Sequence, residues 1–182
     1  MRLQLLLVAA TWLFACIGAG ATGTATVHRN EVYSYEGFAG GRIEIHTAGS
    51  VILGDFGVNA KICSDQSKYF CVNAPGAFYF AVPKHFTNGL KTWKVDGHRY
   101  DVLSSTRWLM IMGNDVPVAI IATTSRSPNG DTATTYFYYS QKIGLIGFES
   151  RLEVPCGKSR KSNEDFPVLY LLNEKSGFGA TN

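Results

Sequence analysis

Short apolar or alternating runs separated by turn-forming residues make up most of this chain. Such runs span residues 32–38, 42–46 and 51–56, with glycines in the gaps between them. A period of two residues, broken every few positions by turn formers, is typical of β-strands, and helical periodicity is almost absent. Further runs of the same kind span residues 60–63, 69–72 and 76–82. The pattern predicts an all-β fold.

The strongest local signal is the dipeptide Asp96-Gly97 between the runs 91–95 and 98–102. Asp-Gly is a preferred two-residue hairpin turn, because both residues accept the positive φ that the turn requires. One face of this hairpin is then aromatic and faces the core, whereas the other carries two like charges toward solvent or a bound anion. The expected cross-strand pairs are Val95 with His98, Lys94 with Arg99, Trp93 with Tyr100, and Thr92 with Asp101.

The same pattern of runs and short turns continues toward the C-terminus. Runs at 107–112, 116–124, 134–139 and 143–149 follow the first hairpin, so residues 91–150 predict a six-stranded antiparallel meander. A long meander removes its exposed edges by closing as a small barrel or folding into a sandwich. We expect one of these two architectures, with a last strand at 167–172.

The first twenty-one residues have the pattern of an export signal. Arg2 supplies a positive charge, residues 3–13 are apolar, and residues 19–21 give the small-x-small pattern at which a signal peptidase cuts. We therefore expect a signal peptide at 1–21, a flexible segment at 22–30 and a single β-rich domain at 31–182, in a secreted or periplasmic protein.

Cys16 supports a second interpretation of the N-terminus. Residues 13–16 resemble a lipoprotein box, in which this cysteine is acylated and residues 18–26 form a flexible tether. The protein would then be lipid-anchored in the outer membrane, with no other membrane contact. Alternatively, Cys16 only pads the apolar segment of a cleaved signal.

Two of the remaining cysteines predict a disulfide. Cys63 and Cys71 flank the polar loop 64–68 between two apolar runs, and an exported compartment permits disulfides. Closing so short a loop contributes roughly 2 to 3 kcal/mol in the chain-entropy model. Cys156 is left without an expected partner.

Charge excludes one class of partner. The formal net charge is only +3, and Arg2 is the one charged residue of the signal segment. Such a weak field argues against nucleic-acid binding. We expect no cofactor and no metal, because the four histidines show no zinc-motif spacing.

Two segments are candidate binding surfaces. In the loop 157–165, Lys158, Arg160 and Lys161 are a candidate site for an anionic surface, although a solvated loop has the same composition. In the run 136–139, alternation places Tyr136 and Tyr138 on one face of a strand, where exposed tyrosines can stack on a sugar or a protein.

No catalytic signature is present, since the chain has no GxSxG, SxxK or HExxH motif. The first hypothesis is therefore a non-enzymatic binding or accessory protein whose partner is a protein or glycan of the cell envelope. The alternative is a small hydrolase acting on an envelope polymer, with His98 or His85 as its base.

Three segments carry a resemblance: Cys63 to Val72, Phe80 to Lys84, and Tyr138 to Phe148. Together they resemble small uncharacterised exported β-proteins of bacteria over roughly half of the mature chain. The resemblance implies a bacterial envelope location and no particular activity.

Overall fold

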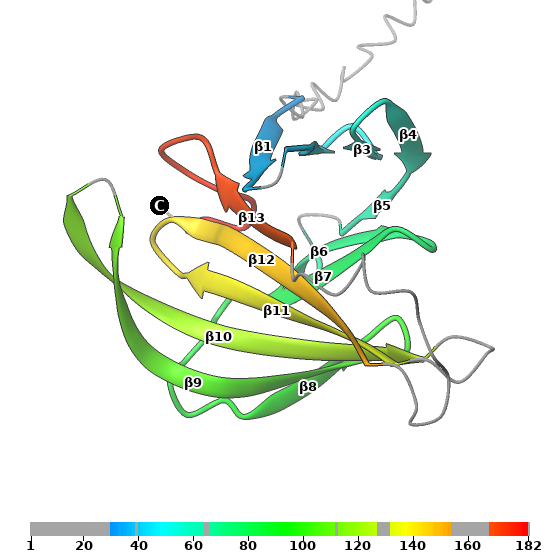
Figure 1. Ribbon diagram of the computed structural model, residues 1–182. Coiled ribbons are helices and arrows are strands. Elements are labelled where there is room, and N and C mark those ends of the chain that lie inside the picture. Colours follow the sequence, from blue (N-terminus) through cyan, green and yellow to red (C-terminus); the bar gives the residue numbers. More distant parts are fainter. Residues whose placement is uncertain are drawn as a thin grey trace, which may run out of the picture.

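Every regular element of the described chain is a β-strand (Figure 1). The computed structural model describes residues 30–38, 40–63, 66–111, 113–126, 132–153 and 168–181. Within these ranges there is no helix long and apolar enough to cross a membrane. The strands are β1 Val32–Gly37, β2 Arg42–His46, β3 Ser50–Leu53, β4 Phe56–Asn59, β5 Lys61–Ile62, β6 Tyr69–Ala74, β7 Phe78–Pro83, β8 Thr92–Val95, β9 His98–Ile111, β10 Asn114–Arg126, β11 Thr132–Ser140, β12 Gly144–Glu153 and β13 Val168–Leu172.

The strands form two antiparallel sheets. Ten of them make one large sheet in the order β4-β3-β2-β1-β13-β12-β11-β10-β9-β8, and β5, β6 and β7 make a small one. The first strand pairs with the last, with Tyr35 opposite Leu172. The all-β, antiparallel prediction is therefore confirmed.

The large sheet does not close into a barrel, so that part of the prediction is wrong. The small sheet instead packs against one of its faces, and aromatic side chains from both sheets fill the core. The rings of Phe78 and Phe80 lie 6.0 and 5.0 Å from the ring of Phe137 on β11. Strand β7 lies against other elements on both of its faces. Five of its six residues are apolar, and this packing buries most of their side chains.

The predicted meander has five strands, β8 to β12, rather than six. Residues 98–102 and 107–112 were expected as separate strands, but His98–Ile111 is continuous as β9. Residues 103–106 continue the strand and pair irregularly with β10, where the register shifts on either side of Ile120. Bulges of this kind bend a strand without ending it. Residues 127–131, between β10 and β11, lie outside the described residues.

The Asp-Gly hairpin forms as predicted. All four expected cross-strand pairs are present, and Asp96 and Gly97 have φ values of 48° and 84°. The rings of Trp93 and Tyr100 are stacked, with 5.7 Å between centroids, and both are buried. Arg99 faces Lys94 but binds Asp101 through two nitrogens, with the shortest contact at 2.9 Å.

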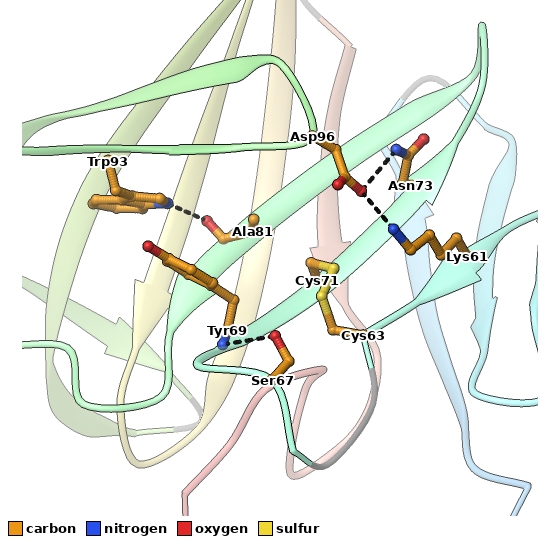
Figure 2. Close-up of a disulfide and its surroundings, with 9 residues drawn as sticks. All are labelled: Lys61, Cys63, Ser67, Tyr69, Cys71, Asn73, Ala81, Trp93 and Asp96. Carbon is orange, nitrogen blue, oxygen red and sulfur yellow. Dashed lines mark hydrogen bonds and ion pairs between the residues drawn. A yellow bond between two sulfur atoms is a disulfide. The ribbon is translucent and has the colours of Figure 1, made fainter.

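Side chains, rather than a backbone ladder, join β8 to the small sheet (Figure 2). The Trp93 Nε1 donates a hydrogen bond of 3.1 Å to the carbonyl oxygen of Ala81 on β7. At the hairpin turn, Asp96 Oδ2 accepts hydrogen bonds from Asn73 (3.2 Å) and Lys61 (3.4 Å). These contacts hold the β8–β9 hairpin against the small sheet without extending either sheet.

The predicted disulfide is present. Cys63 and Cys71 are bonded, with their Cα atoms 5.0 Å apart (Figure 2). The Cys63 N–H also donates to the Cys71 carbonyl oxygen at 3.0 Å. The disulfide therefore ties the segment that follows β5 to strand β6. Cys156 lies outside the described residues.

Asp96→Asn is expected to lower stability by less than about 1 kcal/mol at neutral pH, because the contacts of this carboxylate are exposed. The hydrogen bond from Asn73, and then Lys61, holds the pKa of Asp96 below its usual value. The contribution of the carboxylate is therefore present above the unfolded pKa of about 3.9 and is lost as pH falls through the lower folded pKa. Asn keeps the turn, since Asn-Gly also suits it. In urea unfolding, the free energies of unfolding of the wild type and Asp96→Asn should differ at pH 7 and become equal near pH 2. A difference that stays the same at both pH values would contradict the role of the carboxylate.

Candidate functional site

The β9–β10 hairpin extends past its neighbour in the large sheet (Figure 1). Pairing between β10 and β11 begins at Ala119, whereas pairing between β10 and β9 continues to Asn114. Residues 114–118 therefore form an edge. Pro117 fits this edge, since a residue without an N–H is tolerated where no neighbouring strand needs the donor.

The two faces of this hairpin differ. One face places the buried Val116 and Val118 against Ile146 in a second apolar cluster, which Leu109 joins. Because side chains alternate along a strand, Trp108 and Met110 point to the opposite face. Trp108 is 66% exposed there. A large aromatic side chain is thus held on a rigid strand with its ring in solvent.

Trp108 borders a groove of about 580 Å³. Six segments line this Trp108 groove: the loop after β7, the strands β9, β10 and β11, the β11–β12 turn and the C-terminal segment. The lining residues are Phe86, Asn88, Ser105, Thr106, Trp108, Pro117, Ala119, Tyr139, Ser140, Gln141, Lys142 and Thr181. Its volume is within the range of pockets that hold small molecules or a few sugar units.

The inner wall of the Trp108 groove is fixed by packing and hydrogen bonds. The rings of Phe86 and Tyr139 are buried and meet edge to face at 5.7 Å. Tyr139 donates its hydroxyl proton to the carbonyl oxygen of Gly179 at 2.9 Å, and burial raises the pKa of this hydroxyl to about 12. The backbone N–H and the hydroxyl of Thr181 both donate to the Gln141 carbonyl oxygen at 2.9 Å. The groove is therefore largely preformed.

Ser140 adds an unused hydrogen-bonding group to this wall. The residue is 2% exposed, and its Oγ has no hydrogen-bond partner among the described residues. Leaving a buried hydroxyl unpaired costs roughly 1 to 3 kcal/mol.

The lining of the Trp108 groove is rich in neutral hydrogen-bonding side chains. It offers hydroxyl and amide groups and the cation of Lys142, but no His, Asp or Glu. Among the described residues, no three His, Cys, Asp or Glu side chains are placed to hold a metal ion. General acid–base catalysis most often uses a His, Asp or Glu side chain, and none of these is among the described residues that line this groove.

The two histidines considered as bases lie elsewhere. The ring of His98 stacks on Tyr79 with 4.0 Å between centroids. His85 lines a second groove, and no Asp or Glu is among the residues that line it. The hydrolase alternative thus stays a prediction to which the described residues assign no site.

The predicted tyrosine surface lies outside the Trp108 groove. Tyr136 and Tyr138 are partly buried, whereas the alternating Phe137 and Tyr139 are buried in the core. The guanidinium carbon of Arg151 lies 5.0 Å from the ring centre of Tyr136. Burial, and then Glu149, raises the pKa of Tyr138. The two tyrosines therefore belong to a polar cluster, and their role as a binding surface stays a prediction.

The structure does not describe the other candidate site residues. Cys16, Lys158, Arg160 and Lys161 lie outside the described residues. The same holds for the export signal at 1–21, which stays a prediction.

Sequence reasoning missed Trp108. The signal was present in the run Arg107 to Met112, which is apolar at five successive positions and therefore carries large apolar side chains on both faces of its strand. Pro117 on the partner strand marked the edge. Together they indicated an exposed aromatic residue at a free sheet margin.

Comparison of the chain with protein-family models, with curated proteins and with solved structures gives no match. The resemblance to exported bacterial proteins therefore carries no weight in the proposed function. The function has to be inferred from the residues of the chain.

Proposed function

We propose that this chain is an exported, non-enzymatic binding protein that holds a glycan in the Trp108 groove. The observation that carries the proposal is the 66% exposed Trp108 at the rim of a preformed, polar groove. The N-terminal sequence pattern and the Cys63–Cys71 disulfide support an exported protein.

A sugar matches the chemistry of this groove on two counts. Its ring has an apolar C–H face, which can pack on the exposed indole of Trp108. Its hydroxyls donate and accept hydrogen bonds, as do the Ser, Thr, Asn and Gln side chains of the lining. The unpartnered Oγ of Ser140 is of the same kind.

Tryptophan fluorescence tests this proposal directly. Trp93 is buried and Trp108 is exposed, so acrylamide should quench mainly Trp108 in the described domain. We expect envelope-type oligosaccharides to shift the emission and to protect it from acrylamide. Trp108→Ala should weaken binding at least about 10-fold, as loss of a central aromatic contact usually does.

Two variants serve as controls. Trp108→Phe keeps an aromatic face and should retain measurable affinity for the glycan. It should lose the fluorescence response, and that loss would assign the response to position 108. Tyr136→Ala alters the tyrosine cluster and should leave binding unchanged. The proposal is wrong if glycan affinity survives Trp108→Ala, or if it depends on Tyr136 instead.

A further inference from the structure

A second groove of about 820 Å³ lies beside the same loop that borders the Trp108 groove. Lys68, Lys84, His85 and Lys94 line it, together with residues that carry no charge. No Asp or Glu contributes to its lining. We call it the basic groove.

Loop 84–91 is the wall shared by the two grooves. Phe86 and Asn88 line the Trp108 groove, whereas His85 and Thr87 line the basic groove. The loop turns at residues 84–85 and 88–89, and its side chains divide between the two grooves. A chain-like ligand lying across this loop would contact both.

Backbone pairing concentrates positive charge in the basic groove. The Lys84 N–H donates to the Lys68 carbonyl oxygen at 3.0 Å, so the two lysines start from adjacent backbone positions just after β7 and just before β6. The Lys84 ammonium lies 5.3 Å from the ring centre of Phe70. Like charges held side by side in a concave site raise the local concentration of anions.

The carboxylate of Asp101, across the hairpin from Thr92, is already engaged. Asp101 binds Arg99, with Arg99 Nη2 at 2.9 Å from Oδ1, and this pair lowers the pKa of Asp101. Lys94 is exposed and has no carboxylate partner among the described residues. The same holds for Lys68 within the described part of the chain. Their charges are thus available to a ligand.

We propose that the glycan of the Trp108 groove is an acidic polysaccharide that crosses loop 84–91 and places its carboxylate or sulfate groups in the basic groove. This inference rests on the proposed function. A sugar polymer fits both grooves, because one offers an aromatic face with neutral hydrogen-bonding groups and the other offers cations. A nucleic acid fits less well, because single strands need aromatic side chains for successive bases and Trp108 is one exposed ring.

The test compares two ligands that differ only in charge. Hexagalacturonate and its full methyl ester have the same sugar backbone, and the ester removes the carboxylates. We expect the acid to bind the full-length protein at least about 10-fold more tightly than the ester at low salt, with the difference shrinking as salt is raised. A sulfated oligosaccharide of equal length separates sulfate from carboxylate recognition.

The variant Lys68→Gln/Lys94→Gln should remove the preference for the acid and leave affinity for the ester unchanged. Lys84 is kept because it covers Phe70. The matched control is Arg126→Gln/Lys175→Gln, which removes the same net charge from exposed positions that line neither groove. This control should retain the preference, so net charge alone would not explain the effect.

Three results would overturn the inference. Equal affinity for acid and ester, with Trp108 still required, would refute the acidic ligand and leave the proposed function intact. Acid binding that ignores Trp108→Ala would refute the proposed function and the bridging ligand together. Tighter binding of a single-stranded oligonucleotide or of anionic vesicles than of either sugar would assign the basic groove to another class of partner.

Discussion

Trp93→Ala is expected to lower the free energy of unfolding by about 3 to 5 kcal/mol, which makes it the most damaging single change considered for this protein. Trp93 is 7% exposed, stacks on Tyr100 and meets the edge of Phe86 at 6.0 Å. It also donates to the Ala81 carbonyl oxygen, a contact between the two sheets. Alanine would leave a cavity and release that edge of β7. Urea unfolding followed by circular dichroism measures the loss.

Trp93→Phe separates packing from the hydrogen bond. Phenylalanine keeps an aromatic ring against Tyr100 but has no N–H for Ala81, so we expect a loss of about 1 to 3 kcal/mol. If alanine proved no more damaging than phenylalanine, the ring would contribute little and the core position of Trp93 would be refuted. Lys94→Glu, on the exposed face of the same strand, should change stability by less than about 1 kcal/mol.

Gly144→Ala should be nearly as destabilising, at about 2 to 5 kcal/mol, for two separate reasons. Gly144 has a φ of +90°, which an L side chain rarely adopts. In addition, a Cβ at this position would lie 2.2 Å from the carbonyl oxygen of Gly177. The C-terminal segment would have to move away from β12, and the Tyr139 and Thr181 contacts of the Trp108 groove with it. Thermal unfolding and glycan affinity should both be reduced.

Gly40→Ala is the matched control. Gly40 has a φ of +87°, but no atom lies within 4 Å of the position of its Cβ. Only the backbone strain should appear there, at roughly 1 to 2 kcal/mol, and glycan binding should be unchanged. Equal losses for the two alanine variants would show that the close approach to Gly177 is unimportant.

The sequence predicted local structure well where the chemistry itself is local. The two positive φ values at Asp96 and Gly97 are needed by one turn type, and that turn fixes the whole register from Thr92 to Asp101. The Cys63–Cys71 pairing followed in the same way from a short loop between two strands. In both cases the interacting residues are separated by fewer than ten positions.

Pairing between distant segments was not predictable. Nothing in β1 or β13 specifies the other as its neighbour, because alternating apolar patterns fit any partner of suitable length. The prediction of a closed barrel was wrong for the same reason. The strands within residues 61–83 have ordinary strand patterns, and nothing in those patterns indicates that they form a separate sheet. Which face of Arg107 to Met112 remains exposed depends on this arrangement, and Trp108 was missed for that reason.

The neighbourhood of β1 and β13 also sets an order of events for folding. The meander β8 to β12 joins strands that follow one another closely, so it can form early and at little entropic cost. In the described sheet, the backbone pairing of β1 to β4 with the meander runs through β13, and just after it Asn173 is hydrogen-bonded to Glu36, 137 positions away. A chain synthesised N-terminus first therefore presents its β1 edge unpaired until β13 has emerged. We expect insertion of β13 to be a late step, because it covers the free edges of β1 and β12 together.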